Sequence, residues 1–354
     1  MTSFPVTKVQ TLKEKPPVDK LGFGTLFTDH MFVMDYTDGK GWHDGRIEPY
    51  SPMAMDPSTM VLHYGQAIFE GLKAYKMSDG KVGIFRLESY MARMNRSNAV
   101  VCIPAVDEAL VADAIKSLVD LERDWVPNSN EASLYIRPFI FATDPYLGVR
   151  PSKTYKLMVI LSPVGAYYPE GFKPVKILVS DKYVRAVRGG VGTAKTPANY
   201  AASLRAAVEA QAMGYTQVLW LDGVEFKYVE EVGTMNIFFV IGDRVITPPL
   251  EGSILGGITR DSVLKITREW GLKVEEYRLS IDEVFEASEK GELKEIFGTG
   301  TAAVISPVSQ LYWKDRVAVP GDGSVGQLSQ KLYDYITGTQ YGLLPDEHKW
   351  VTRF

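Results

Sequence analysis

Apolar residues recur along this chain at two spacings, one typical of helices and one typical of strands. In residues 81–101 a short apolar run passes into a segment with helical spacing. Four residues recur at that spacing: Tyr90, Met91, Met94 and Asn98. A second amphipathic helix is predicted in residues 107–126, with one stripe formed by Leu110, Ala114, Leu118 and Leu121.

Strand-like segments follow in residues 132–143 and 154–164. Because side chains alternate along a strand, the first segment has two predicted faces. These are Tyr135, Arg137 and Phe139 on one face, and Leu134 and Ile136 on the other.

The second half of the chain repeats this mixture. Strands are predicted in residues 175–181, 216–223 and 234–249, the last being two strands joined by a Gly-Asp turn. Helices are predicted in residues 198–214 and 260–271, and both end at a glycine, a common helix terminator. Strands and helices in mixed order indicate an α/β (mixed α+β) fold.

A chain of 354 residues is too long for one ordinary core, because single cores stop growing at about 250 to 300 residues. The segment GAYYPEGFKP holds several glycine and proline breakers. We therefore expect an N-terminal domain in residues 1–164, an interdomain loop in residues 165–176 and a C-terminal domain in residues 177–354. The polar first twenty residues are expected to form an arm over the surface or across a neighbour.

Charge and composition exclude several partners. The 39 basic and 43 acidic residues are spread evenly, so no basic stripe predicts nucleic-acid binding. No run approaches the ~18 apolar residues of a membrane helix, and the start lacks a secretory or organelle signal, which predicts a cytoplasmic protein without a membrane partner. The single cysteine, Cys102, is expected to be buried, and His43 and His63 lack metal-ligand spacing, so no metal site is expected.

The segment RGGVGTAKTPANY, residues 188–200, places Lys195 among small residues. It comes close to the phosphate-binding pattern G-x-x-x-x-G-K-[ST], but Ala194 stands where glycine is required. In that interpretation the chain binds a nucleotide and Asp222 supplies a magnesium ligand. Pro197 argues against it, because it delays the next helix beyond the lysine. The alternative is a lysine that forms a Schiff base with a planar cofactor, for which small neighbours leave room.

Two other segments are suited to a monophosphate. The segment GGIT, residues 256–259, directly precedes a predicted helix, whose first N–H groups and dipole favour an anion. Residues 299–302 form a second candidate, with glycine and threonine alternating. Two anion sites without a magnesium motif favour the Schiff-base lysine.

Three charged residues on predicted strands are further candidates. Strand alternation predicts that one of Glu230 and Glu231 is solvated and the other points inward. An inward carboxylate needs a partner, and a protonated pyridine nitrogen is a suitable one. Arg137 among aromatic residues indicates a carboxylate clamp, with a structural ion pair as the alternative.

Taken together, these segments resemble the branched-chain amino acid aminotransferases, pyridoxal 5'-phosphate (PLP) enzymes of fold type IV in the class IV aminotransferase family. The resemblance covers nearly the whole chain and is carried by FGTLFTDHMF, LHYGQAIFEGLKAY, IFRLESYMARM, LYIRPF, SPVGAYYPEG, GGVGTAKTPANYAASL, QVLWLDG, EEVGTMNIF, TPPLEGSILGGITRDSVL and IFGTGTAAVISPV. It implies a smaller N-terminal α/β domain, a larger β-rich C-terminal domain with surrounding helices, and a homodimer with sites at the domain boundary.

The resemblance also implies residue roles. Lys195 is the implied catalytic residue, which binds PLP covalently and moves the α-proton while the cofactor cycles through pyridoxamine 5'-phosphate. Tyr200 is implied to bind the phenolic oxygen of the cofactor and Glu231 its pyridine nitrogen. The other implied cofactor contacts are Arg86, Gly257, Ile258, Thr259, Gly300 and Thr301. The implied substrate contacts are Phe23, Tyr64, Tyr135, Arg137, Val149, Tyr167, Thr234, Thr301 and Ala302, with Tyr135, Arg137 and Val149 reaching the site from the partner subunit.

The implied reaction is reversible amino transfer between L-leucine, L-isoleucine or L-valine and 2-oxoglutarate, giving the branched 2-oxo acid and L-glutamate. D-amino acid transaminases and aminodeoxychorismate lyases share the lysine and phosphate segments, but YIRPF and EEVGTMN argue against both. Two segments depart from the family: TPAN follows the lysine where many relatives have glycines, and GTAAVIS lacks the C-x-x-C pair of mammalian relatives. Redox regulation through such a pair is not expected.

Overall fold

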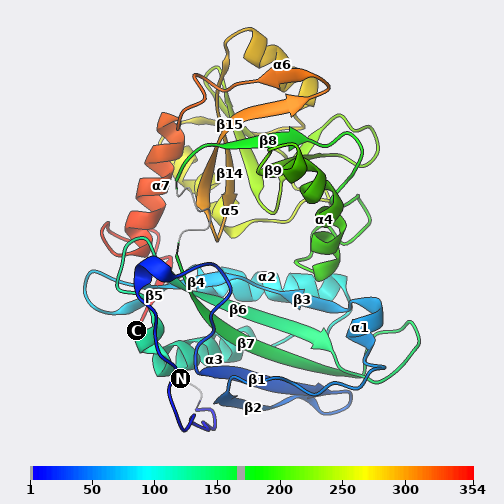
Figure 1. Cartoon of the computed structure of the whole chain (residues 1–354), viewed down its shortest axis with the longest axis vertical. Coiled ribbons are helices and arrows are strands. Elements are labelled where there is room, and N and C mark those ends of the chain that lie inside the picture. The colour runs from blue at the N-terminus through cyan, green and yellow to red at the C-terminus, as the bar shows by residue number, and fades with distance from the viewer. Residues whose placement is uncertain (1–2, 166–171) are drawn as a thin grey trace. The chain divides into compact units, whose positions relative to one another are not determined.

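The computed structural model describes residues 3–165 and 172–354 and divides into two compact units, each described by itself (Figure 1). Unit 1 comprises Met1–Tyr167, Ala194–Pro197 and Gly338–Phe354, and unit 2 comprises Tyr168–Thr193 and Ala198–Thr337. The chain thus enters unit 1 three times. The expected domain boundaries stay a prediction, because half of the interval that would divide them, residues 166–171, lies outside the described residues.

Unit 1 is built on an antiparallel sheet with the strand order β17-β5-β4-β6-β7-β1-β2, and β3 also pairs with β6. Its strands are β1 (His30–Thr37), β2 (Gly41–Pro49), β3 (Ala67–Phe69), β4 (Leu72–Lys76), β5 (Val82–Phe85), β6 (Ser133–Ala142), β7 (Thr154–Val164) and β17 (Val351–Arg353). In β6 the predicted alternation is confirmed. Leu134 and Ile136 are fully buried, whereas Tyr135, Arg137 and Phe139 are partly exposed.

The helices of unit 1 are α1 (Met60–Tyr64), α2 (Leu87–Val100) and α3 (Glu108–Leu121). The predicted buried positions of α2 are confirmed: Tyr90, Met91, Met94 and Asn98. The stripe predicted for α3 is only partly right, since the buried residues are Val111, Ala114, Ile115, Leu118 and Val119. Because α3 contacts both α2 and β1, its buried face is wider than one stripe, and Leu110 and Leu121 lie at its edges.

Unit 2 is built on a mixed sheet with the strand order β10-β9-β8-β15-β14-β11-β12-β13, and β16 pairs with β15. Its strands are β8 (Val175–Val179), β9 (Gln217–Leu221), β10 (Val229–Val232), β11 (Asn236–Ile241), β12 (Arg244–Thr247), β13 (Lys273–Glu276), β14 (Leu293–Gly300), β15 (Val304–Trp313) and β16 (Arg316–Ala318). The predicted Gly-Asp hairpin is confirmed, since Ile241 pairs with Arg244 and Gly242 has a φ of 61°.

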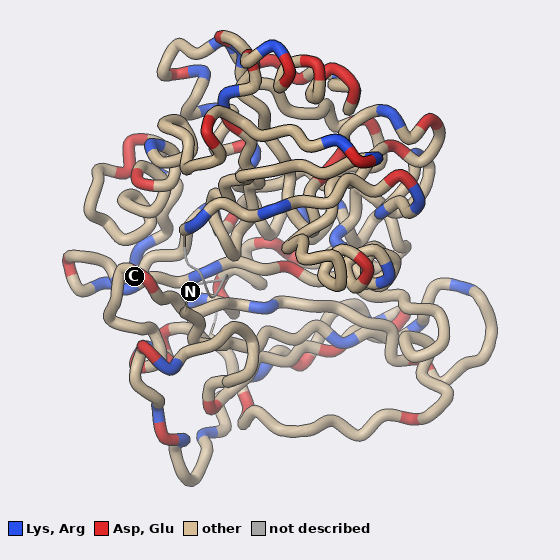
Figure 2. The backbone as a smooth tube through the Cα atoms, turned by 45° about the horizontal axis from the view of Figure 1, so that its top comes forward, with Lys and Arg blue, Asp and Glu red and all other residues tan. Residues whose placement is uncertain are grey.

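The remaining helices are α4 (Pro197–Ala212), α5 (Ile258–Glu269), α6 (Ile281–Glu289) and α7 (Gln327–Gln340). In α4, Ala206 and Ala210 pack against Val218 and Trp220 of β9. No helix among the described residues is long and apolar enough to cross a membrane. The predicted α/β class is confirmed, and basic and acidic residues are interspersed along both units (Figure 2).

The N-terminal arm lies on the surface of unit 1, which is one of the two placements expected from the sequence. Val6 forms a β-bridge with Ile47, and the Val9 N–H donates to Nε2 of His30 at 3.0 Å. The expectation that Cys102 is buried is wrong, because its side chain is exposed. Cys102 stands in the turn after α2 with a left-handed φ of 57°, so the chain reverses there instead of packing inward.

Candidate active site

Lys195 belongs to unit 1, where two hydrogen bonds hold its main chain. Its N–H donates to Oγ of Ser97 on α2 at 2.9 Å, and its carbonyl accepts from the N–H of Phe69 at 2.9 Å. The Thr196 hydroxyl donates to the carbonyl of Ala67 at 2.8 Å. The lysine therefore lies beside β3, and α4 begins two residues later at Pro197, as the sequence predicts.

The ring of Phe69 brings Lys195 and Arg137 together. Nζ of Lys195 and Cζ of Arg137 each lie 4.8 Å from the centroid of this ring. Arg137 also donates to the Tyr135 hydroxyl at 3.2 Å, and the Tyr135 ring packs edge-on against Phe23 with centroids 5.3 Å apart. Four predicted site residues thus form one group around Phe69, which we call the Phe69 cluster. Sequence reasoning missed Phe69, because nothing in its local pattern separates it from a core aromatic residue.

A buried ion pair fixes the backbone next to the Phe69 cluster. Arg93 donates to both carboxylate oxygens of Glu70, at 2.8 and 2.7 Å, and both side chains are buried. The Glu70 N–H in turn donates to the carbonyl of Pro138 at 2.7 Å. Since Glu70 and Pro138 directly follow Phe69 and Arg137, this main-chain hydrogen bond joins the two segments that carry Phe69 and Arg137, and the ion pair anchors Glu70 to α2.

Three predicted residues of unit 1 have other surroundings. Arg86 is buried at the start of α2, where it donates to Oγ of Ser89 at 3.1 Å and its Cζ lies 4.9 Å from the ring centroid of Trp350. Tyr64, at the end of α1, is 42% exposed, and Val149, in the loop after β6, is 89% exposed. Tyr167 lies outside the described residues.

A pocket in unit 2 gathers three further predicted residues. Tyr200 comes from α4, Glu231 from β10, and Thr234 from the turn between β10 and β11. The pocket is also lined by Arg185, Asn199, Ser203, Gly233 and Leu255. We call it the Glu231 pocket.

The expectation that one of Glu230 and Glu231 is solvated is wrong. They are 8% and 4% exposed, respectively. The flanking strand pairs are Val229 with Leu221 and Val232 with Leu219. Two residues of β10 therefore face the single residue Trp220 of β9, which is a β-bulge. A bulge interrupts the alternation of side chains, so neighbouring residues can both turn inward.

The carboxylate of Glu231 has both side-chain and main-chain partners. Its Oε2 forms an ion pair with the guanidinium of Arg185 and accepts from the Leu255 N–H at 3.5 Å, and its Oε1 accepts from Nδ2 of Asn236 at 3.3 Å. Sequence reasoning missed the role of Arg185. The signal was available, because a buried carboxylate needs a cationic or hydrogen-bonding partner.

The start of α5 has the features of an anion site. Gly257 is its N-cap residue, and no side chain caps the helix. A Cβ on Gly257 would lie 1.9 Å from Oδ1 of Asn236, so only glycine fits there. Ile258 and Thr259 open the helix and are buried, and their N–H groups belong to the first turn, where a helix attracts anions.

The second predicted anion segment forms the turn from β14 into β15. Gly300 pairs with Val304, and Thr301 and Ala302 lie in the turn, half-buried. Oγ1 of the neighbouring Thr299 is buried and has no hydrogen-bond partner among the described residues. A buried hydroxyl of this kind suits a polar ligand.

The nucleotide-binding alternative required Asp222 to hold a magnesium ion. Instead, the Asp222 carboxylate accepts hydrogen bonds from the backbone N–H groups of Val224, Glu225, Lys227 and Tyr228. Burial opposes its ionisation, but these N–H groups keep the pKa of Asp222 below its usual value. Asp222 is thus an organiser of this turn, and Lys195 does not open a helix.

These donor sets fit PLP by their chemistry. An ionised carboxylate in a pocket suits a protonated ring nitrogen, and an uncapped helix start suits a phosphate. Both features lie in unit 2. The Phe69 cluster in unit 1 supplies an amine and a guanidinium.

Comparison with known proteins agrees with this chemistry. The sequence model of the family described as "Amino-transferase class IV" matches residues 67–311. The Bacillus subtilis protein named branched-chain-amino-acid aminotransferase 2 is 56% identical over 347 residues, covering 98% of this chain and 96% of that protein.

Two crystal structures extend the likeness to the fold. The Escherichia coli branched-chain amino acid aminotransferase has a TM-score of 0.77 and 27% identity, covering 90% of this chain and 98% of its own. The branched-chain amino acid aminotransferase from Thermobaculum terrenum, in its PLP form, has a TM-score of 0.74 and 26% identity, covering 91% and 97%. The chain belongs to the class IV aminotransferases, a PLP-dependent family, and within it to the branched-chain-amino-acid aminotransferases.

Proposed function

We propose that the protein transfers the amino group reversibly between L-leucine, L-isoleucine or L-valine and 2-oxoglutarate, with PLP as its cofactor. The observation that carries the proposal is the Glu231 pocket, where a buried carboxylate lies with Tyr200 and Thr234. Arg185 offsets the cost of burying this carboxylate, and the place of Glu231 in a lined pocket also suits it to bind the protonated pyridine nitrogen of PLP. Membership of the branched-chain family supports the choice of amino acids.

Bound PLP supplies an aldehyde that condenses with amino groups and a ring that accepts the electron pair of the broken Cα–H bond. In the proposal, Glu231 keeps the ring nitrogen protonated and Tyr200 donates to the phenolic oxygen. The first-turn N–H groups at Ile258 and Thr259 and the Thr301 segment bind the phosphate, with Arg86 as a further contact.

The Phe69 cluster supports the roles proposed for the substrate side. Lys195 would hold and move the Cα proton with its amine, a general acid–base role at one positioned group. Arg137 binds the γ-carboxylate of glutamate, and the aromatic rings of Phe23, Phe69 and Tyr135 accept the branched side chain. The shared contact of Arg137 and Lys195 with Phe69 favours Arg137 and Tyr135 acting in their own chain, instead of in the partner subunit.

We propose that a homodimer completes the site. In support, α1 and the loop after β6 carry large exposed apolar residues: Leu62, Tyr64, Tyr146, Leu147 and Val149. The two segments run together, since Thr59 forms a β-bridge with Pro145 and the Met60 N–H donates to the carbonyl of Asp144 at 3.0 Å. A second copy would bury this surface and bring Tyr64 and Val149 to its site. The single exposed cysteine supports a cytoplasmic setting.

Absorption spectroscopy and a substrate panel test the proposal. Purified protein should show the visible band of lysine-bound PLP and lose it when L-leucine is added, but not when D-leucine is added. Of the L- and D-amino acids offered with 2-oxoglutarate, L-leucine, L-isoleucine and L-valine should be the best donors. A preference for D-alanine would indicate a D-amino acid transaminase, and a colourless protein would refute PLP binding.

A further inference from the structure

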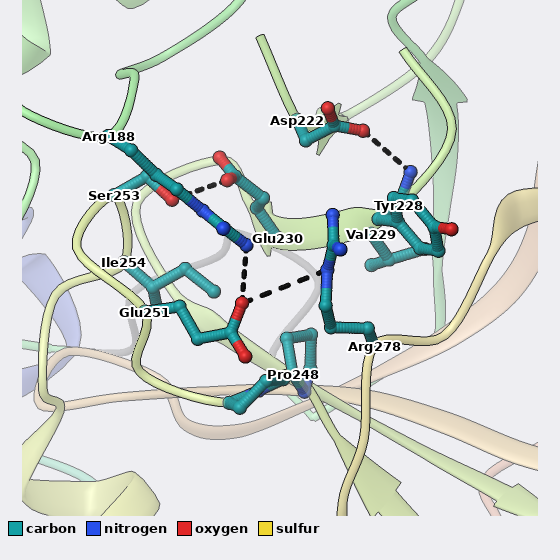
Figure 3. Close-up of a pocket in the computed structure, with 11 residues that line it drawn as sticks. Arg188, Asp222, Tyr228, Val229, Glu230, Pro248, Glu251, Ser253, Ile254 and Arg278 are labelled. Atoms are coloured by element: carbon teal, nitrogen blue, oxygen red, sulfur yellow. Dashed lines mark hydrogen bonds and ion pairs between the residues drawn. The ribbon is translucent and has the colours of Figure 1, made fainter. Parts of the chain in front are cut away.

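Glu230 lines a second pocket of unit 2 (Figure 3), and the residues that line it differ from those of the Glu231 pocket. Figure 3 shows its carboxylate pointing toward Ser253, whose hydroxyl donates a hydrogen bond to Oε1. Both side chains are buried, at 8% and 2% exposure. A hydrogen bond between a buried hydroxyl and a buried carboxyl group is among the stronger ones in a protein.

Ser253 is held at two further points. Its carbonyl accepts from the guanidinium of Arg185 at 2.6 Å, the same guanidinium that faces Glu231. A Cβ on Gly192 would lie 2.1 Å from this carbonyl oxygen, so the glycine-rich loop before Lys195 packs directly on the Ser253 backbone. Because Gly192 has no side chain, the Ser253 backbone can approach it closely. From the sequence alone, the small residues of this loop are instead expected to leave room for a cofactor.

The residues that follow Ser253 reach both cofactor contacts of unit 2. The Leu255 N–H donates to Glu231, and the Leu255 carbonyl accepts from Nδ2 of Asn236 at 2.8 Å. Two residues later, Gly257 is the N-cap of α5. The path of residues 253–257 therefore sets the donors around Glu231 and the position of the first turn of α5.

We propose that Glu230 is a positioning residue for the cofactor: through its hydrogen bond with Ser253 it holds residues 253–257, and with them the phosphate-binding start of α5, against Glu231. The inference rests on the proposed function, because PLP is the ligand whose ring and phosphate these two contacts bind. Glu230 acts through Ser253 and does not itself line the Glu231 pocket.

Several charged groups lie around Glu230. It adjoins the carboxylates of Glu231 and Asp222 and the guanidinium of Arg185. Arg188 and Arg278, which also line its pocket, are both engaged by Glu251. Placing an acidic residue beside two other carboxylates lowers the stability of the folded protein. A positioning role for Glu230 would offset this cost.

The test measures the dissociation constant of PLP for the full-length protein by titrating its visible band. Ser253→Ala removes one oxygen atom and should weaken PLP binding about tenfold, the size expected for one buried hydrogen bond. Glu230→Ala should have a similar effect. The PLP dissociation constant of the double variant should not exceed the larger of the two single-variant values, because both changes break the same hydrogen bond.

Two variants act as controls. Glu230→Gln keeps an oxygen that accepts from Ser253 and should bind PLP within about twofold of the unchanged protein. Glu251→Gln alters a partly exposed carboxylate of the same segment, two residues before Ser253, and should leave PLP affinity unchanged. A loss in Glu251→Gln equal to that in Ser253→Ala would assign the effect to general loop charge and overturn the proposal.

Other outcomes are equally decisive. PLP affinity of Ser253→Ala within twofold of the unchanged protein, or additive losses in the double variant, would refute the positioning role. If the unchanged protein itself showed no visible band with PLP, the proposed function would fail instead, so the two failures are distinguishable.

Discussion

Arg185 and Glu231 form a buried ion pair between the segment before the glycine-rich loop and the bulge of β10. Their side chains are 9% and 5% exposed. The same guanidinium donates to the carbonyl groups of Gly192 and Ser253, at 3.1 and 2.6 Å. Arg185 therefore links Glu231, the carboxylate proposed to bind the pyridine ring, to two separate backbone segments, at Gly192 and at Ser253.

Replacing Arg185 with leucine should destabilise the protein by about 3 kcal/mol or more, because Glu231 would stay buried without its cationic partner. The free energy of unfolding in urea measures this. Arg188→Leu is the matched control, since Arg188 pairs with Glu251 at a site where both side chains are about half exposed. That pair should contribute less than about 1 kcal/mol, and equal losses in the two variants would contradict a special role for Arg185.

Replacing Lys195 with alanine should abolish amino transfer, because it removes the amine proposed to move the Cα proton. Treatment with borohydride should no longer attach PLP covalently to the protein. Mass spectrometry of the digested chain would test this. Lys182→Ala, which removes an exposed lysine of unit 2, should leave both the labelling and the turnover intact. Labelling that persists in Lys195→Ala would reject Lys195 as the covalent site.

Replacing Arg137 with alanine should impair glutamate and 2-oxoglutarate more than leucine. The lost charge-assisted hydrogen bonds concern only the γ-carboxylate and correspond to roughly 1.5–3 kcal/mol, a factor of about ten or more in kcat/KM. Steady-state kinetics with each substrate pair gives the two ratios. Arg123→Ala, at an exposed ion pair with Asp120, serves as the control. An equal loss for leucine and glutamate would argue against the clamp.

The stability of the protein should depend on pH through Glu230. Burial raises the pKa of Glu230 to about 7; the Ser253 hydrogen bond opposes this and the neighbouring Glu231 adds to it. A carboxyl group whose pKa is higher in the folded state favours folding while it is protonated. This contribution is full below the usual pKa of about 4.3 and is lost as the pH rises toward and through 7.

Glu230→Gln removes that titration, so the variant should gain stability relative to the unchanged protein between pH 5 and pH 8. We expect a gain of about 2 kcal/mol, less than the full shift implies because the site is partly screened. Urea unfolding of both proteins at several pH values isolates the effect, since the two proteins differ only at this side chain. A difference that stays constant from pH 5 to pH 8 would show that Glu230 does not titrate there.

Local patterns in the sequence determined most of the secondary structure and the chemistry of the site. Helical spacing predicted the buried positions of α2, and strand alternation predicted the faces of β6, because both depend only on backbone periodicity. Pro197 predicted where α4 begins, since its ring disfavours a helical residue before it. The family was indicated by sequence segments such as GGVGTAKTPANYAASL and EEVGTMNIF, which resemble those of the branched-chain amino acid aminotransferases.

The tertiary structure alone decided which side chains meet. The bulge in β10 buried both Glu230 and Glu231, because one extra residue in a strand is visible only against its paired neighbour. Arg185 became the partner of Glu231 and Phe69 the shared contact of Lys195 and Arg137, although these residues are far apart in sequence. Such contacts depend on how separate segments pack in three dimensions, which no local period encodes.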